Sequence, residues 1–547
     1  MRWFYLNRYI FFVFLFSLLP FGFWFSTPHL VHTHDGLVHL PRIAAFYKEL
    51  VALNIPVRWA SDLNFGYGMP LFVFIYHTPY IVSSFFLVLG LSLVNAFKLS
   101  FLTSFLLSGL FMFLFTRRLF KNEKIAFFTT LLYQFAPFHL VDLLIRGSFG
   151  EVYTYALLPL SLYFLLVFFE TLKVRYLIFT SVATTLLVLS HNSISLLFFG
   201  VIVLFVLFFA KDFKQRFFAA GSLLGGLMLS AYYWIPALVE HKFTYGDLYM
   251  KDLYRTHFLE PWKLIVPNLT DAQFLQTDHL SLTIGLVQTL AIVAAIVWLV
   301  QKKRHDEEGK RIIVFSVFLI GLAVYFMLPI SLLFWENISF LRQFQFPWRF
   351  LTIIVFASSL IGVFLYPYVK KKIVFISTIL LVVFSSFVYW IPKEGVDIID
   401  ESYYWNFPLT TTYYGETDVI WSAGPQKEYP ENRIDIIAGD GEILSQSTDQ
   451  PTYQTLFVRA DTDVTLVSHT QYFPGWRVYR FFEREEIPIQ FQDPNYRGLI
   501  TFTLPKGEHD ILIQFGESKT RLIANVISLS GVVLVVIASF VFWKKSL

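Results

Sequence analysis

The chain has 547 residues, of which 56% are hydrophobic, 19% aromatic and only 15% charged, and its mean hydropathy is +0.58. A soluble globular protein of this size does not need so much apolar surface, so the composition excludes that class and predicts an integral membrane protein. The formal net charge of +4 says little about partners, because the basic residues cluster between apolar runs. The absence of cysteine from the sequence excludes disulfides, thiolate catalysis and metal sites with Cys ligands.

Twelve apolar runs are candidate membrane spans, since a helix needs about 20 residues to cross a bilayer. Arg2 and Arg8 flank the start of the first run, which has no small-residue cleavage site and is predicted to be a retained signal anchor. With the amino terminus inside, every basic cluster between spans falls on one side, as the positive-inside rule requires. We therefore expect a multi-pass plasma-membrane protein with both termini in the cytoplasm. The candidate spans are Tyr9–Phe25, Asn95–Phe115, Ile125–Leu140, Tyr153–Phe169, Arg175–Leu189, Ile194–Ala210, Phe217–Trp234, Leu282–Val300, Ile312–Pro329, Phe350–Tyr366, Ile373–Trp390 and Leu522–Trp543.

One further apolar stretch, Leu71–Gly90, is long enough to span but is predicted not to cross. A crossing there would invert every later span and place the basic clusters outside. The stretch also contains His77, Pro79 and a pair of serines. We expect a re-entrant or interfacial segment that completes a first outer loop of residues 26–94.

The first outer loop concentrates polar side chains beside a membrane segment. Asp35, His39 and Arg42 stand at i, i+4 and i+7, so a helix after Gly36 would place them on one face. An acid, an imidazole and a guanidinium together suit acid–base chemistry on an anionic substrate. The alternative is that Asp35 caps a short surface helix, with His39 and Arg42 solvated at the lipid headgroups.

A second outer loop adds Arg146 and Glu151 at the mouth of a span. Glu151 would be a second carboxylate at the depth of Asp35, or only a partner of Arg146 and of the helix dipole. His191 ends a span and is expected to face the outer cavity, although a lone His there is more often an interfacial residue.

A later outer loop brings Gln345, Trp348 and Arg349 to the start of a span. Arg349 could grip a phosphate while Trp348 stacks a sugar or an isoprenoid, or these residues could belong to the aromatic belt of the membrane interface. The sequence contains no HExxH, Walker loop, GxSxG or zinc spacing, so hydrolase and ATPase functions lose their usual support.

The polar region from 392 to 521 alternates like strands between turns rich in Pro and Gly. We expect an extracytoplasmic β-sandwich or jelly roll there, after a transmembrane domain of residues 1–391 and before a final span and cytoplasmic tail of residues 522–547. The predicted strands are Val464–Ser468, Trp476–Tyr479, Ile487–Phe491, Gly498–Leu504 and Ile511–Phe515.

Several motifs carry a resemblance to a known family. They are Asp35-Gly-x-x-His39-x-x-Arg42, Arg58-Trp59, Asn64-x-Gly66-Tyr-Gly68-x-Pro70, Arg146-Gly-x-x-x-Glu151 and Gln345-Phe-Pro-Trp-Arg349. Together they resemble a bacterial and archaeal membrane family labelled 6-pyruvoyl-tetrahydropterin-synthase-related, whose architecture is similar to the GT-C glycosyltransferases. Tyr472-Phe-Pro-Gly-Trp476-Arg477 and Pro505-Lys-Gly-Glu-His509 resemble the outer domain of bacterial membrane proteins thought to glycosylate cell-envelope polymers.

The resemblance implies a polytopic GT-C-like helical fold and an inverting sugar transfer outside the cytoplasm. The donor would be a polyprenyl-phosphate sugar and the acceptor an envelope glycan, lipid or protein, in contact with membrane lipids and without nucleic acid. Asp35 would be the base or a metal ligand, Glu151 the second acid and Arg349 the contact to the lipid phosphate.

The same resemblance leaves metal use open. A divalent ion, if used, would take Asp35 and Glu151, but the second loop lacks the paired acids of oligosaccharyltransferases because Asp142 is too far along the chain from Glu151. The other expected substrate-binding residues are His39, Arg42, Arg146, His191, Gln345 and Trp348. Rival functions are a transporter or flippase of an envelope lipid and a non-catalytic glycan-binding scaffold. Charges at the outer ends of spans, rather than near the midplane, favour chemistry over transport.

Overall fold

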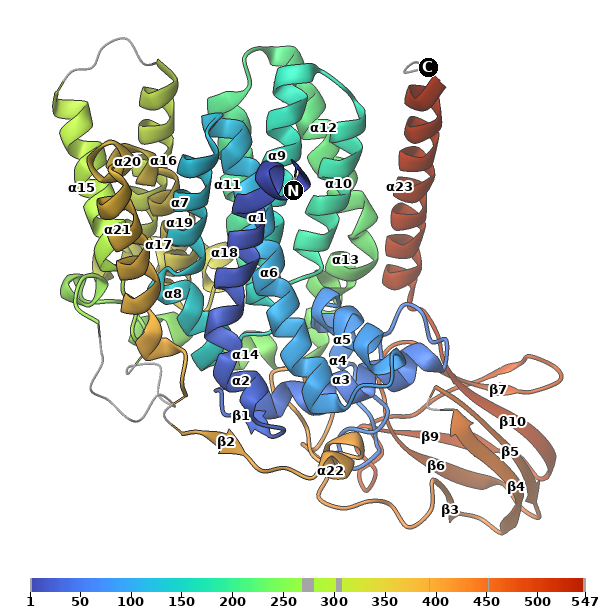
Figure 1. Ribbon diagram of the computed structural model, residues 1–547. Coiled ribbons are helices and arrows are strands. Elements are labelled where there is room, and N and C mark those ends of the chain that lie inside the picture. Colours follow the sequence, from blue (N-terminus) through green and yellow to red (C-terminus); the bar gives the residue numbers. More distant parts are fainter. Residues whose placement is uncertain (1, 268–279, 302–306, 393, 451, 545–547) are drawn as a thin grey trace.

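The structure is a computed structural model that describes residues 2–267, 280–301, 307–392, 394–450 and 452–544. A bundle of long apolar helices forms one part of the molecule, and a β-rich region lies at one end of it (Figure 1). Both marked chain ends lie toward the side of the bundle that faces away from the β-rich region (Figure 1). The predicted class, a polytopic helical membrane protein with an all-β region before its last helix, is confirmed.

Eight helices in the described residues are long and apolar enough to cross a membrane. Two bent pairs raise the number to ten if each is one broken span. The first pair, α7 (Glu123–Gln134) with Pro137–Arg146, bends by 54° where Pro137 opens the second helix and restricts the residue before it. The eight are Arg8–Ser26 (α1 to α2), α6 (Leu93–Phe120), α9 (Glu151–Thr171), α11 (Asn192–Phe209), α16 (Glu307–Met327), Pro347–Val369 (η8, α19 and α20), Lys372–Tyr389 (α21 and η9) and Lys519–Phe540 in α23 (Lys519–Lys544).

The other two predicted spans are helical but shorter than expected. They are α10 (Arg175–Val188) and α15 (Leu286–Val300), of 14 and 15 residues, whereas a span needs about 20. The second bent pair joins α12 (Phe213–Leu229) to Ala231–Phe243, with α13 (Ala231–Val239) as its first part, at 70°. Each of the twelve predicted runs therefore contains a helix: eight are long and apolar enough to cross alone, the two bent pairs bring the number to ten, and α10 and α15 are shorter apolar helices.

The first outer loop is mostly ordered into short helices at the end of the bundle that adjoins the β-rich region (Figure 1). Helix α3 (Gly36–Val51) begins where the spacing of Asp35, His39 and Arg42 predicts it. The Leu71–Gly90 stretch forms two pieces, α4 (Leu71–Phe74) and α5 (Thr78–Val88). With 11 residues, α5 is shorter than the roughly 20 that a span needs, and the expectation that this stretch does not cross stays a prediction.

The carboxy-terminal region folds into two antiparallel sheets that share one apolar core. The larger sheet has the order β4-β5-β10-β7-β8 and the smaller the order β3-β6-β9. The core alternates along the strands, as in Leu456 and Val458, which point inward from β5. The strands are β3 (Ile434–Ala438), β4 (Gly441–Gln450), β5 (Tyr453–Ala460), β6 (Val464–Gln471), β7 (Trp476–Arg480), β8 (Glu486–Ile487), β9 (Leu499–Leu504) and β10 (Gly507–Phe515).

The sandwich is joined to the first outer loop through a continuous core. Trp59 packs edge-on against Trp476, with ring centroids 5.4 Å apart, and lies 5.1 Å from the ring of Phe515. Gly68 has a φ of +75°, and a Cβ there would lie 2.4 Å from Nε1 of Trp59. The Gly66-Tyr-Gly68 motif therefore serves the docking of the sandwich, because only glycine fits that turn beside the indole.

The segment before β3 carries no strand of the sandwich and lies along the first loop instead. Its short strand β2 (Val396–Asp397) pairs with β1 (Leu30–Val31). Helix α22 (Glu401–Trp405) follows, and the main-chain oxygen of Trp405 accepts a 2.6 Å hydrogen bond from Lys48 of α3. This arrangement brings residues 396–418 over the part of the loop that holds Asp35.

Candidate active site

Asp35 is fixed in place by the second outer loop. Its main-chain N–H donates to the carbonyl of Arg146 at 3.0 Å, and that of His34 donates to Ile145 at 3.1 Å. Gly147, with a φ of +64°, permits this approach, since a Cβ there would lie 2.4 Å from the hydroxyl of Thr33. The two loops predicted to share a site are therefore in direct main-chain contact.

The Asp35 side chain does not cap α3, although the residue stands at the N-cap position. Its carboxylate instead accepts a hydrogen bond from the hydroxyl of Tyr413 at 3.4 Å, and Tyr413 also donates to the carbonyl of His34 at 3.0 Å. The side chain is partly exposed. A half-buried carboxylate that caps no helix can accept a proton from a ligand.

Glu151 lies at the centre of a buried ion-pair cluster. It is fully buried and accepts from both terminal nitrogens of Arg146, at 2.9 and 3.2 Å, and from Nε of Arg349 at 3.1 Å. Both of its oxygens are thus held by guanidinium groups. This geometry suits a residue that positions two arginines better than one that carries a proton.

Asp142 belongs to the same cluster, contrary to the expectation that it is too distant from Glu151. A short π-helix, η2 (Val141–Arg146), places its carboxylate against Nη1 of Arg146, so that Arg146 bridges the two acids. Tyr155 donates to the other oxygen of Asp142 at 2.7 Å. The four-residue spacing between Asp142 and Arg146 was the available sequence signal, but the distance along the chain to Glu151 concealed it.

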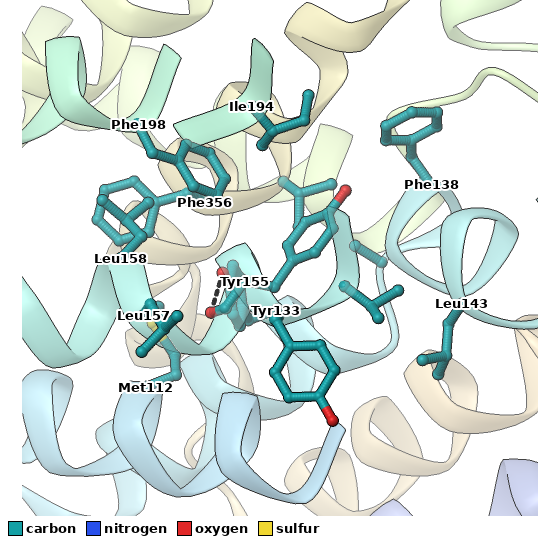
Figure 2. Close-up of a cluster of buried hydrophobic side chains, with 14 of the residues drawn as sticks. Met112, Tyr133, Phe138, Leu143, Tyr155, Leu157, Leu158, Ile194, Phe198 and Phe356 are labelled. Carbon is teal, nitrogen blue, oxygen red and sulfur yellow. Dashed lines mark hydrogen bonds between the residues drawn. The ribbon is translucent and has the colours of Figure 1, made fainter. Parts of the chain in front are cut away.

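Tyr155 also anchors the cluster in the membrane core. Its ring lies among the buried apolar side chains drawn in Figure 2, beside Phe198 and Tyr133. The hydroxyl of Tyr133 donates to the carbonyl of Tyr155 at 2.7 Å. Close packing of these apolar side chains against Tyr155 restricts the neighbouring ion pairs to one geometry.

Arg349 reaches Glu151 from the last outer loop. Its Nη1 donates to the side-chain oxygen of Gln345 at 2.8 Å and to the carbonyl of Phe344 at 3.0 Å. Among the described residues, Nη2 of Arg349 has no hydrogen-bond partner, so one edge of the guanidinium keeps donors available. Trp348 stacks against Arg146, with the guanidinium carbon 4.6 Å from the ring centroid.

His191 joins the cluster from the start of α11. Its Nε2 is 3.6 Å from Glu151, and its Nδ1 accepts from the main-chain N–H of Ile194 at 3.2 Å. Six predicted residues are therefore brought together by the fold. They are Arg146, Glu151, His191, Gln345, Trp348 and Arg349.

His39 and Arg42 turn toward other partners. His39 shares a hydrogen bond with the hydroxyl of Tyr80 at 3.2 Å. Arg42 donates from Nε to the hydroxyl of Thr411 at 3.1 Å and from Nη2 to the carbonyl of the same residue. In this geometry Arg42 fastens the segment around Thr411 onto α3.

A family comparison adds a finding independent of this geometry. A family model described as 6-pyruvoyl-tetrahydropterin synthase related domain, membrane protein, matches residues 74–393. The chain belongs to this family. The resemblance predicted from the motifs is confirmed, and the matched region of the family includes Glu151 and Arg349 but begins after Asp35.

The solved structures similar to this chain include two proteins that are named as sugar transferases. The arabinofuranosyltransferase AftD from Mycobacteria is 16% identical, over 72% of this chain and 28% of that chain, with a TM-score of 0.41. The Archaeoglobus fulgidus oligosaccharyltransferase in the apo form is 12% identical, over 75% and 56%, with a TM-score of 0.45. ArnT from Cupriavidus metallidurans bound to undecaprenyl phosphate is 13% identical, over 67% and 80%, with a TM-score of 0.33.

The chain spans less than a third of the length of the mycobacterial arabinofuranosyltransferase. At such TM-scores the likeness establishes nothing about chemistry, which has to come from the side chains themselves. No curated protein sequence matches the chain.

The electrostatics of this family member favour Asp35 as the group that exchanges a proton. Burial raises the pKa of Asp35, and the guanidinium groups of Arg146 and Arg42 lower it only in part. The outcome is a carboxyl with a pKa above its usual value, which makes it a stronger base once ionised. Burial and the charge of Arg146 hold the pKa of His34 down to about 4, so His34 is neutral at physiological pH.

The donor set does not match a divalent metal site. Both oxygens of Glu151 are held by arginines, and the described residues contain no group of three His, Asp or Glu side chains placed to hold an ion. Two guanidinium groups beside the acid would also repel a cation.

Proposed function

We propose that this membrane protein transfers a sugar from a polyprenyl-phosphate donor to a cell-envelope acceptor. The observation that carries the proposal is the main-chain contact of Asp35 with Arg146. It sets a partly exposed acid beside a buried Arg146–Glu151–Arg349 cluster at the end of the bundle. A base next to fixed positive charge matches what such a transfer requires.

In this proposal Asp35 is the base. The acceptor hydroxyl gives its proton to the carboxylate of Asp35 while its oxygen forms a bond to the anomeric carbon of the donor sugar. The bond between that carbon and the phosphate oxygen breaks, and its electron pair leaves with the lipid phosphate. Attack opposite the leaving phosphate inverts the anomeric carbon.

Arg349 would receive the phosphate through its free Nη2. Since Nε and Nη1 of Arg349 are already held by Glu151 and Gln345, the guanidinium is oriented before the donor arrives. Both terminal nitrogens of Arg146 already donate to carboxylates, those of Asp142 and Glu151. Arg146 therefore contributes by holding Glu151 in place and by adding positive charge nearby. Preorganised charge of this kind stabilises a leaving anion at low reorganisation cost.

We further propose that this end of the bundle faces outward. Both marked termini lie at the other end, where the positive-inside rule places the basic clusters in the cytoplasm (Figure 1). A polyprenyl carrier in the bilayer would then present its phosphate at the outer interface, at the level of Arg349.

The test is Asp35→Asn in the purified full-length protein. Radiolabelled undecaprenyl-phosphate sugars are supplied with cell-envelope fractions, and transfer of label is measured. We expect transfer to fall about 10²–10⁴-fold, the worth of a positioned base, with the protein still folded. Asp62→Asn is the matched control, because Asp62 belongs to the same loop but pairs with Lys48 at the surface. Full turnover in the Asp35 variant would reject its catalytic role.

A further inference from the structure

A polar cavity of about 260 Å³ opens beside the arginine cluster. It lies between η3 (Glu240–Phe243) and α14 (Gly246–Met250) on one side and α18 (Ser339–Arg342) with the turn after it on the other. A Cβ at Gly246 would lie 2.5 Å from Nε2 of His241, so this wall depends on glycine. Its polar lining includes His241, Asp247, Lys251, Arg342, Gln343 and Gln345.

Gln345 connects this cavity to the cluster. Its side-chain oxygen accepts from Nη1 of Arg349 at 2.8 Å, so its amide nitrogen is the end left to the cavity that it lines. No described residue hydrogen-bonds to that nitrogen. The backbone of Gln345 has a φ of +61°, a conformation that side chains other than glycine rarely adopt. Strained residues of this type are concentrated at functional sites.

The lining fits a ligand with hydroxyl groups. The side chains of Gln343 and Gln345 supply amide donors and acceptors, and Asp247 adds an exposed carboxylate 3.3 Å from His241. An apolar chain would leave these groups without partners, at a cost in affinity. Lys251 and Arg342 bring positive charge and Asp247 brings negative charge to the same lining, so a bare anion would pair with only part of its polar groups. A sugar ring, whose neighbouring hydroxyls both donate and accept, satisfies all of them.

We infer that this cavity, the Gln345 cavity, binds the sugar of the lipid-phosphate donor. The inference rests on the proposed function, because it places the donor phosphate on Nη2 of Arg349. The sugar is bonded directly to that phosphate, and Gln345 is the residue that touches both Arg349 and the cavity. A volume of about 260 Å³ is small for a ligand site and admits a single ring rather than a long glycan.

The experiment compares the binding of sugar 1-phosphates with that of inorganic phosphate. Glucose, mannose and galactose 1-phosphates serve as soluble probes for the full-length protein in detergent, and Kd is measured by calorimetry. In the wild type we expect at least one sugar 1-phosphate to bind ten times more tightly than phosphate. In the Asp247→Asn, Gln343→Ala double variant this advantage should vanish while the Kd for phosphate stays the same.

Two further variants sharpen the comparison. Gln345→Asn retains a residue that tolerates the left-handed backbone but shortens the amide, so it should lose the same advantage. Asp252→Asn is the control, since Asp252 lies on the same loop but pairs with Arg255 outside the cavity.

The outcomes separate the two levels of the proposal. If no sugar 1-phosphate binds more tightly than phosphate, or if the advantage survives in the cavity variants, the sugar-site inference is overturned and the proposed transfer stands. If neither phosphate nor any sugar 1-phosphate binds, and the wild type also transfers no label from undecaprenyl-phosphate sugars, the proposed function fails together with the inference.

Discussion

Replacement of Glu151 by Gln tests whether this acid organises the site or performs the chemistry. The carboxylate is fully buried and accepts three hydrogen bonds from two arginines. Removing one partner of a buried ion pair costs about 3–5 kcal/mol, because the other charge is left uncompensated. Asp142 still neutralises part of Arg146, so we expect the lower end of that range, about 3 kcal/mol.

The matched control is Glu170→Gln on the same helix, α9. Glu170 pairs with Arg118 at the surface, where an ion pair is worth about 0–1 kcal/mol. Thermal denaturation in detergent should therefore show a clear drop in the midpoint for the Glu151 variant and almost none for the Glu170 variant. Equal midpoints would refute the view that Glu151 holds the cluster together. A normal midpoint with lost transfer would instead identify Glu151 as a catalytic acid.

Three other expectations can be checked. Arg349→Lys should raise the apparent KM for an undecaprenyl-phosphate sugar at least tenfold, because an ammonium cannot span Glu151, Gln345 and a phosphate at once; Arg255→Lys, at an exposed ion pair, is the control, and an unchanged KM would count against Arg349. Burial raises the pKa of Glu49 to about 7, above its ordinary 4.5, so the folded state binds this proton more tightly and stability falls as pH rises from about 4.5 to 7. That loss is of order 3 kcal/mol, and Glu49→Gln should flatten the pH dependence of thermal stability; an unaltered slope would contradict it. A reporter placed at Asn95, at the start of α6, should be exposed outside the cell, and a cytoplasmic signal there would reject the topology.

The helical pattern and the polar motifs were predictable from the sequence because each depends on local features. Apolar runs and the positive-inside rule located the helices, and the i, i+4, i+7 spacing located α3. The motifs around Glu151 and Arg349 identified residues that the fold brings together. These positions carry charge in an apolar chain, which is itself a strong signal.

What the sequence did not predict depends on contacts between distant segments. Strands β3, β4 and β5 escaped prediction because their exposed faces carry many polar residues, and β3 and β5 also pair with strands far along the chain, β6 and β10. Asp142 was set aside because the π-helix that turns it toward Arg146 has no simple sequence signature. The hydrogen bond from Tyr413 to Asp35 joins residues 378 positions apart, and no periodicity reveals such a pair.

The first outer loop explains why the sandwich and the candidate site occur in one chain. One end of the loop sets Asp35 against Arg146, and the other inserts Trp59 into the core of the sandwich. Helix α3 lies between them and is bonded through Arg42 to Thr411, in the segment that precedes the sandwich. Any shift of the sandwich relative to the bundle would therefore displace Asp35. The β-region thus acts as part of the scaffold that positions this acid rather than as an appended module.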